Sequence, residues 1–299
     1  IGKGKIEELL SLMLATDATG IICDDELSPA QMNNLEHELE CKVMDRTLLI
    51  LDIFAKHATT SEGKIQVELA QLRYRASRLV GLGASLSRLG GGIGTRGPGE
   101  KKLESDRRLI RKRITALKEE LQQVEKHREL LRTGRTRGKM KTAAIVGYTN
   151  AGKSTLLNTL TGAGVLSADK LFATLDPTTR ALTLDDGQQI LLTDTVGFIR
   201  KLPHNLVEAF KSTLEEAKYA DYIIHVVDCS NPQAERQMEV VYDTLHELEV
   251  QGKKTITLFN KVDLGPVIFL KDKMADHTLK VSAKTGEGLV ELKELLGKI

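Results

Sequence analysis

A glycine-rich turn at residues 147–154 constrains this chain more than any other segment. It reads Gly147, Tyr148, Thr149, Asn150, Ala151, Gly152, Lys153 and Ser154, which is a glycine, four residues and then Gly-Lys-Ser. The apolar run 142–146 precedes it, and a helix-forming run, 155–160, follows it. A strand, a glycine loop and a helix N-terminus in this order point main-chain N–H groups at a phosphate. The sequence therefore predicts a loop that binds a nucleoside triphosphate.

Two later segments predict that the base is guanine. Asn260, Lys261, Val262 and Asp263 follow the apolar run 255–259, and Ser282, Ala283 and Lys284 follow the run 278–281. The Asp263 carboxylate can accept hydrogen bonds from guanine N1–H and from its exocyclic amine. Adenine has no donor at N1 and would leave this carboxylate unpaired, which is costly. We expect Asn260 to bond the base edge, the Lys261 stem to lie along the ring, and the Ala283 N–H to meet guanine O6.

The phosphates and a Mg²⁺ ion require their own ligands. We expect Lys153 to bridge the β- and γ-phosphates and the Ser154 hydroxyl to bind Mg²⁺. Asp194 ends the apolar run 190–193 and is expected to hold the same ion, while the Gly197 N–H can sense the γ-phosphate. The residues predicted to bind the phosphates are Gly147, Asn150, Ala151, Gly152, Lys153, Ser154 and Thr155.

A GTP switch also needs a threonine whose hydroxyl reaches Mg²⁺ and whose N–H reaches the γ-phosphate. Thr174, Thr178 and Thr179 compete within residues 171–179, and we favour Thr174. The predicted catalytic set is then Lys153, Thr174 and Gly197, and the predicted metal ligands are Ser154, Thr174 and Asp194.

Two residues near the phosphates bear on hydrolysis. Phe198 follows the segment 194–197, at a position where many GTPases have a glutamine that orients the attacking water. Phenylalanine cannot do this, so we expect slow hydrolysis without a partner, unless a neighbouring polar residue substitutes. Asn150 occupies a position where a monovalent cation can be held near the phosphates, which predicts stimulation by K⁺.

Length and patterning predict an α/β protein of two domains, since 299 residues exceed one ordinary domain. We expect residues 1–60 to form a small α/β subdomain, with strands near 20–25 and 41–45 and a helix started by Ser28 and Pro29. Residues 61–133 carry heptad-like apolar stripes, which predict an antiparallel helical hairpin or, alternatively, two helices packed on a domain core. A basic linker, 134–140, then leads to a P-loop GTPase domain, 141–299, with a mostly parallel sheet flanked by helices.

The hairpin region has an unusual tip and an unusual charge. Residues 90–99 contain six glycines, and the loop 90–100 is either a slack connector or a segment able to approach a phosphate closely. From Lys101 to Lys139 there are fourteen Lys or Arg against six Asp or Glu. This excess indicates a solvated helix face or an anionic partner such as nucleic acid.

Composition limits the remaining possibilities. No apolar run approaches the roughly 20 residues that span a membrane, and no signal peptide is visible, so we expect a cytoplasmic protein, as a monomer. The first residue is Ile1 rather than Met, and a natural N-terminal segment is expected to precede it. The three cysteines show no Cys-x-x-Cys pairing and are interpreted as reduced packing residues.

The segments 147–156, 171–178 and 194–199, together with 91–100 and Asp106-Arg107-Arg108, resemble the HflX family of GTPases. The resemblance covers nearly the whole chain. It implies a bacterial or organellar GTPase that, with GTP, binds the large ribosomal subunit and separates stalled or idle ribosomes into subunits under stress. It also implies that the hairpin contacts ribosomal RNA near the peptidyl transferase centre. Carried onto this chain, the RNA-binding residues are Gly91, Gly92, Ile93, Gly94, Thr95, Arg96, Gly97, Pro98, Gly99, Arg107 and Arg108.

Two rival functions remain open, and Asp263 opposes a third, an RNA-remodelling ATPase, through its choice of base. The first is a GTPase that assembles immature large subunits, and the second is a signalling switch whose hairpin binds protein. Addition of the protein and GTP to intact ribosomes separates the first rival, because an assembly factor should not raise the fraction of free subunits. Nuclease treatment separates the second, because a protein-binding hairpin would not need RNA.

Overall fold

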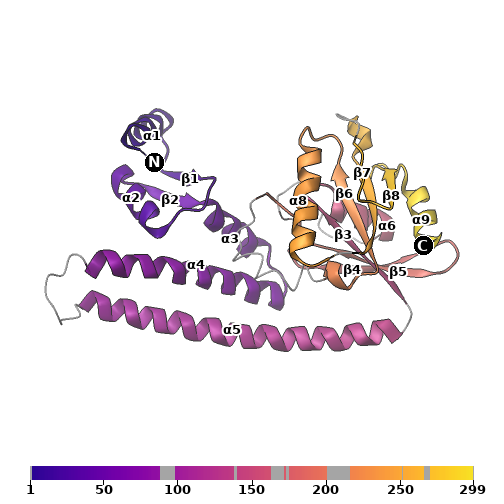
Figure 1. Cartoon of the computed structure of the whole chain (residues 1–299), viewed down its shortest axis with the longest axis horizontal. Helices are drawn as coiled ribbons and strands as arrows, with labels where there is room; N and C mark the ends of the chain where they lie inside the picture. Colours follow the sequence, from indigo (N-terminus) through magenta and orange to yellow (C-terminus); the bar gives the residue numbers. More distant parts are fainter. Residues whose placement is uncertain are drawn as a thin grey trace. The chain divides into compact units, whose positions relative to one another are not determined.

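The computed structural model describes residues 2–87, 98–137, 140–162, 172, 175–200, 216–250, 252–265 and 270–298. The chain divides into two compact units (Figure 1). The first contains Ile1–Lys56 and Lys64–Gln123, and the second contains His57–Gly63 and Val124–Ile299. Each unit is described by itself below.

The first unit begins with a small α/β arrangement. Its elements are α1 (Lys3–Thr16), β1 (Gly20–Cys23), α2 (Pro29–Leu39), β2 (Lys42–Asp45) and α3 (Arg46–His57). The two strands pair in parallel, with Gly20 opposite Lys42. The Ser28 hydroxyl accepts the Gln31 N–H while the Gln31 side chain accepts the Ser28 N–H. This capping box, with Pro29 at the first helical position, confirms the helix start predicted there.

Most of two long helices, α4 (Ser61–Ser87) and α5 (Pro98–Arg137), also belongs to this unit. Arg113 of α5 makes two hydrogen bonds to Glu68 of α4, at 2.8 and 2.9 Å. Arg107 donates from Nη2 to the Leu79 carbonyl oxygen, at 2.6 Å. Because the later α4 residue meets the earlier α5 residue, the two helices run antiparallel, and they lie side by side in Figure 1.

The observed helix ends differ from the boundaries expected from the sequence. Helix α5 continues to Arg137, so the segment 134–137, expected to belong to the linker, is helical. The same helix begins at Pro98, inside the segment expected to form the glycine tip, because proline is favoured in the first turn, where its missing N–H costs nothing. Residues 88–97, which make up the rest of that tip, lie outside the described residues.

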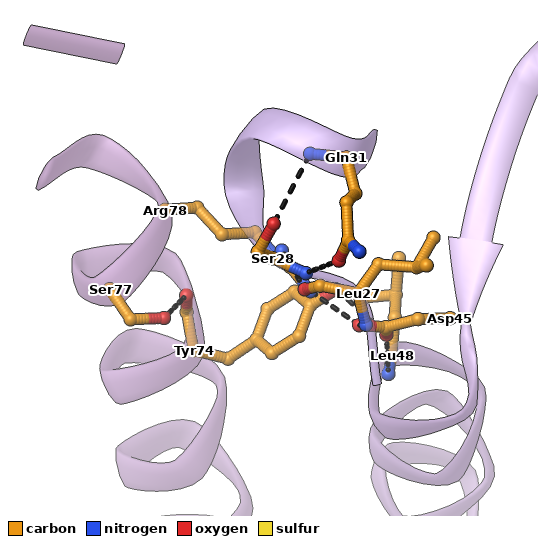
Figure 2. A network of polar contacts seen from close by, with 8 residues as sticks. All are labelled: Leu27, Ser28, Gln31, Asp45, Leu48, Tyr74, Ser77 and Arg78. Atoms are coloured by element: carbon orange, nitrogen blue, oxygen red, sulfur yellow. Dashed lines mark hydrogen bonds and ion pairs between the residues drawn. The ribbon is translucent and has the colours of Figure 1, made fainter. Parts of the chain in front are cut away.

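A buried carboxylate organises the first unit (Figure 2). Asp45, at the end of β2, has no exposed surface. It accepts hydrogen bonds from the Tyr74 hydroxyl at 2.9 Å and from Arg78 Nη2 at 2.5 Å, both on α4, and from the main-chain N–H groups of Leu48 and Leu27. The Arg78 guanidinium also lies 3.9 Å from the centre of the Tyr74 ring. Four donors thus compensate the lost hydration of one carboxylate.

Helix α4 therefore buries two faces. Leu69 belongs to the apolar stripe expected for a hairpin, and it is buried together with Leu117 of α5. Val67, Ala70 and Tyr74 lie on a second face and are also buried. Periodicity predicted the first face only, because the second combines an alanine and a tyrosine with polar residues such as Gln66.

The second unit contains a six-stranded sheet in the order β4-β5-β3-β6-β7-β8. The strands are β3 (Lys141–Gly147), β4 (Thr178–Thr183), β5 (Gln189–Asp194), β6 (Tyr222–Asp228), β7 (Lys254–Asn260) and β8 (His277–Lys280). Strand β4 pairs antiparallel at one edge, and every other pairing of this sheet is parallel. The expected mostly parallel sheet is confirmed.

Helices cover both faces of this sheet, with α8 on one side and α9 on the other (Figure 1). Leu156 and Leu160 of α6 (Lys153–Thr161) and Leu292 of α9 (Leu289–Lys298) join one apolar core with strand residues such as Ile224. Met238 of α8 (Ala234–Glu247) packs in a separate core on the other face. The expected α/β fold class is therefore confirmed. Burial on both faces explains why the central strands β3, β6 and β7 read as nearly continuous apolar runs.

Within the part of the chain described above, no helix combines the length and apolarity needed to cross a membrane. The three cysteines are free, and Cys229 is buried.

Candidate nucleotide-binding site

The predicted motifs all follow the carboxyl ends of parallel strands. The loop 148–152 follows β3, the segment 195–198 follows β5, residues 261–263 follow β7, and residues 281–284 follow β8. Neighbouring parallel strands end at the same edge of a sheet, where ligands of open α/β folds bind. The short 3₁₀ helix η1 (Val262–Leu264) lies in the third of these loops.

Two glycines allow close main-chain approach in the first loop. A Cβ atom at Gly147 would lie 2.4 Å from the Val226 carbonyl oxygen of the neighbouring strand. Gly152 has a φ of 99°, and a Cβ there would lie 2.3 Å from Asn260 Nδ2. Helix α6 begins at the next residue, Lys153, so its N-terminus faces this loop. The arrangement suits a phosphate, because N–H groups and the helix dipole both favour negative charge there.

Lys153 lies buried at the start of α6, with 6% of its surface exposed. Its Nζ donates to the Tyr148 carbonyl oxygen at 3.1 Å. Burial lowers the pKa of Lys153 to about 8, and the nearby Asp194 opposes this shift. A phosphate group would supply the negative charge that this cation lacks in a buried setting.

Two of the three residues predicted to hold Mg²⁺, Ser154 and Asp194, lie in contact with each other. Asp194 has no exposed surface, and its Oδ2 accepts a hydrogen bond from Ser154 Oγ at 2.7 Å. A hydroxyl and a carboxylate in contact are the oxygen ligands that Mg²⁺ prefers, so this pair fits such an ion. When bound, the ion would neutralise phosphate charge.

The switch threonine is not settled by the described residues. Thr174 lies outside them. Thr178 stands opposite Asp194 in the ladder between β4 and β5, and Thr179 stands opposite Thr193, with 2.9 Å between the two hydroxyls. The preference for Thr174 stays a prediction.

Hydrogen bonds tie the first loop to both segments that would sense the γ-phosphate. Thr149 accepts the Phe172 N–H on its hydroxyl at 3.1 Å and donates its own N–H to the Phe198 carbonyl oxygen at 2.8 Å. Phe198 in turn donates to the Gly147 carbonyl oxygen at 3.1 Å. A Cβ at Gly197 would lie 2.8 Å from Thr149 Cα. Thr149 was missed from the sequence because the phosphate-loop pattern leaves its position unspecified.

Asn260 links the phosphate loop to the last guanine segment. Its Nδ2 donates to the Ala151 carbonyl oxygen at 2.8 Å, and its Oδ1 accepts the Ala283 N–H at 2.9 Å. The side chain is 2% exposed. Asn260 and Ala283, both expected to contact the base, thus bind each other, because a buried amide must satisfy both of its ends.

Asp263 is an exposed residue of η1, and its Oδ1 accepts the Ser282 hydroxyl at 2.7 Å. Lys261 adopts a φ of 69° and places its Nζ 2.8 Å from Asp228 Oδ2. Asp228, at the end of β6, was missed by sequence reasoning, although its place at a strand end was a usable signal. Lys284 is exposed.

The other predicted residues have mixed outcomes. Asn150, the candidate K⁺ ligand, is exposed with a φ of 63°. Arg108 is exposed, whereas Arg107 binds the Leu79 carbonyl oxygen. Of the expected RNA-binding tip, Pro98 and Gly99 open α5, and Gly91, Gly92, Ile93, Gly94, Thr95, Arg96 and Gly97 lie outside the described residues.

A phosphate loop, a Ser–Asp pair suited to Mg²⁺ and two guanine segments, all at one edge of a mostly parallel sheet, define a P-loop GTPase. Comparison with known proteins agrees with this class. Residues 142–261 match the family model of 50S ribosome-binding GTPases, residues 57–135 the middle region of GTP-binding GTPases, and residues 1–55 their N-terminal region. The chain belongs to the HflX family of GTPases, and it is a GTP hydrolase.

Individual relatives carry this assignment. The GTPase HflX of Lacrimispora saccharolytica is 68% identical over 300 residues, which cover 100% of this chain and 71% of the relative. That of Escherichia coli is 47% identical, covering 99% of this chain and 70% of the relative. A GTP-binding protein of Sulfolobus solfataricus, solved in complex with GDP, has a TM-score of 0.55 at 27% identity, covering 100% of this chain and 85% of that one.

Proposed function

We propose that this GTPase binds the large ribosomal subunit in its GTP form and separates stalled or idle ribosomes into subunits under stress. The observation that carries the proposal is the union, in one chain, of a guanine-nucleotide site with a helix that has an exposed basic face. The matched model of 50S ribosome-binding GTPases supports the choice of target. On this proposal the protein acts in the cytoplasm, as a monomer.

The basic face lies on α5. Arg108, Arg111 and Lys112 are exposed, and their spacing of three and four residues places them on one side of the helix. Arg113, by contrast, is paired with Glu68, which leaves it less able to bind an external anion. Exposed cations in a row provide phosphate contacts, and each contact releases counterions on binding RNA. We therefore assign Arg108, Arg111 and Lys112 to ribosomal RNA, together with the glycine tip.

The nucleotide controls this interaction through differential affinity. Lys153 binds the β- and γ-phosphates, while Ser154 and Asp194 hold Mg²⁺. The γ-phosphate orders the segments that follow Phe172 and Asp194, and the ordered form binds the ribosome more tightly. Hydrolysis removes that difference and releases the protein. Asn150 would place K⁺ beside the phosphates, so GTPase rates in K⁺ and Na⁺ buffers should differ.

The test is sedimentation of ribosomes with the protein and a non-hydrolysable GTP analogue. We expect co-sedimentation with large subunits and a larger fraction of free subunits than with GDP. The double variant Arg108→Glu/Arg111→Glu should weaken binding to large subunits. The slope of log affinity against log salt concentration should become shallower by about two. A matched control is Lys254→Glu/Lys273→Glu, which reverses two exposed cations of the second unit.

Two outcomes contradict the proposal. If the protein binds large subunits but leaves intact ribosomes whole, it is an assembly factor. If the charge-reversed α5 variant binds as tightly as its control, the basic face is not the RNA-binding surface.

A further inference from the structure

The carboxylate of Asp176 receives an unusual set of hydrogen bonds. Its Oδ2 accepts the Thr59 N–H at 3.0 Å, the Thr59 hydroxyl at 2.7 Å and the Thr60 N–H at 2.9 Å. Its Oδ1 accepts the Thr60 hydroxyl. All three residues belong to the second unit, although 117 positions separate Asp176 from Thr59. Four donors on one carboxylate form a specific seat rather than a chance surface contact.

This seat lies at the start of helix α4. Thr60 precedes the first helical residue, Ser61, and its hydroxyl accepts the Gly63 N–H at 3.0 Å, as an N-cap does. The helix is therefore capped by its own chain, and Asp176 adds a negative charge where the helix dipole favours one. Helix formation alone does not require a carboxylate from so distant a segment.

Gly63 makes room for this carboxylate. A Cβ atom at position 63 would lie 2.2 Å from Asp176 Oδ1 and 3.2 Å from Thr60 Oγ1. Glycine is otherwise a poor helix residue, since alanine is favoured by about 1 kcal/mol in a helix interior. The glycine in the first turn of α4 thus gives up helix propensity and gains close approach by Asp176.

Asp176 belongs to the segment in which the switch threonine is expected. At one end of this segment the Phe172 N–H is bonded to Thr149 of the phosphate loop. At the other end Asp176 is bonded to Thr59 and Thr60, next to the buried Leu175. Phe172 and Asp176 are therefore hydrogen-bonded to two different elements, the phosphate loop and the start of α4.

We propose that Asp176 is a positioning residue that couples the switch segment to the first turn of helix α4. The inference rests on the proposed function, in which GTP orders this segment. Any rearrangement of this segment around the γ-phosphate would therefore strain or break the hydrogen bonds of Phe172 or those of Asp176. The position of Asp176 then differs between the GDP and GTP states, and its hydrogen bonds to the start of α4 differ with it. The first turn of α4, the helix that leads into the hairpin, therefore changes with the bound nucleotide.

Amide hydrogen exchange of the full chain tests the coupling directly. We expect the amides of residues 59–66 to exchange at rates that differ by about tenfold or more between GDP and a GTP analogue. Asp176→Ala and Thr59→Val/Thr60→Val should bring the two rates together, within about twofold. The matched control is Asp185→Asn, an exposed aspartate in the turn after β4, which should keep the full difference. Equal rates in the two states of the unmodified protein would overturn the proposal, and so would a full difference in Asp176→Ala.

Gly63→Ala provides an independent variant that leaves the Asp176 carboxylate chemically intact. If the seat were only a helix cap, alanine should protect the first turn of α4 in both nucleotide states. On our proposal alanine displaces Asp176 and narrows the difference in amide exchange rate between the GDP and GTP-analogue states. It should also change the ratio of GTP-analogue to GDP affinity by about tenfold, which is the effect expected for one or two charged hydrogen bonds. An unchanged ratio would contradict the proposal.

Binding to large subunits, measured with the same variants, separates this inference from the proposed function. If the unmodified protein fails to bind large subunits, the ribosomal function is wrong, yet the exchange measurement still decides the coupling. If the unmodified protein binds large subunits, and Asp176→Ala binds them equally well with GDP and with the GTP analogue, then the Asp176 contacts transmit the nucleotide state to the hairpin. If Asp176→Ala keeps the full preference of binding for the GTP-analogue state, the coupling is wrong although the ribosomal function stands.

Discussion

The Ser154 hydroxyl lies 2.7 Å from the Oδ2 atom of Asp194, although the two residues are 40 positions apart in the chain. One belongs to the first turn of α6 and the other to the end of β5. Their contact joins the helix start that follows the phosphate loop to the segment 194–197. It also brings together two oxygen ligands of the kind that Mg²⁺ selects.

Asp194→Asn should abolish most Mg²⁺-dependent catalysis. The amide keeps the shape of the side chain but loses the charge that attracts the ion, so we expect kcat/KM for GTP to fall by about 10² to 10³. The measurement is GTPase rate against Mg²⁺ concentration, with GDP affinity in EDTA as the check on folding. Thr193→Ser, one residue earlier, is the control. An unchanged Mg²⁺ dependence would show that this pair does not hold the ion.

Asn260→Ala should weaken the binding of guanine nucleotides, because Asn260 joins two of the loops expected to surround them. The substitution leaves the Ala151 carbonyl oxygen and the Ala283 N–H without their partner, and the two loops around the nucleotide lose their link. Each lost partner costs about 1 to 3 kcal/mol, so GDP affinity should fall by about 30-fold or more. Calorimetric titration with GDP measures this. Asn231→Ala removes a half-buried asparagine whose Oδ1 accepts the Gln233 N–H, and it serves as the control. Equal losses of GDP affinity in the two variants would argue against a special role for Asn260.

His225 should make the fold sensitive to mild acid. It is 1% exposed on β6, its ring meets the Tyr242 ring edge-on at 5.1 Å, and its Nδ1 lies 3.9 Å from Asp272 Oδ2. Burial lowers the pKa of His225 to about 4, opposed by Asp272 and reinforced by Lys153. The unfolded chain therefore binds the extra proton at higher pH than the folded chain does. Stability present above pH 6.5 should be lost as the pH falls towards about 4, by up to roughly 3 kcal/mol.

Urea unfolding between pH 7 and pH 4 measures this effect, and His225→Phe, which keeps a ring against Tyr242, should flatten the slope. Burial raises the pKa of Asp272, but hydrogen bonds from Thr257 and Tyr242 outweigh this and hold the pKa below its ordinary value. His277→Phe changes an exposed histidine and should leave the slope as it is. The same slope in His225→Phe as in the unmodified protein would exclude His225 as its source.

Phe198→Gln should not create a faster GTPase. The Phe198 side chain is 2% exposed and lies in the interior, so a glutamine there would bury an amide instead of orienting a water. We expect a loss of about 2 to 4 kcal/mol of folding free energy and no gain in the single-turnover rate. Phe198→Leu keeps the site apolar and should lose less stability. Faster hydrolysis by the glutamine variant would mean that this side chain can turn towards the phosphates.

The nucleotide loops at Gly147 and Asn260 were predictable because each has a fixed spacing and follows a largely buried strand. The phosphate loop at Gly147 and the segment at Asn260 are recognisable from a few residues, and the parallel sheet then brings them together. The contact between Asp176 and Thr59 leaves no such trace, since it joins single polar residues 117 positions apart. The Lys261–Asp228 ion pair was also missed, although the place of Asp228 at the end of β6 was a usable signal.

Helix α4 shows a different limit of sequence reasoning. A heptad stripe identifies a face that packs on another helix, and Leu69 obeys it. The second buried face, with Tyr74 bonded to Asp45, depends on where β2 ends, which periodicity along α4 does not encode. The two ends of α5 were also predicted wrongly by a few residues. The glycines near Pro98 and near Arg137 suggested loops, but the helix includes both of these residues.

A side chain added at Gly152 would meet the Asn260 side chain, whereas one added at Gly147 would meet the main-chain oxygen of Val226. Any residue at position 226 would present that oxygen. No second-site substitution can shorten a carbonyl group. A genetic screen for suppressors of a Gly147 replacement should therefore recover true revertants rather than compensating mutants.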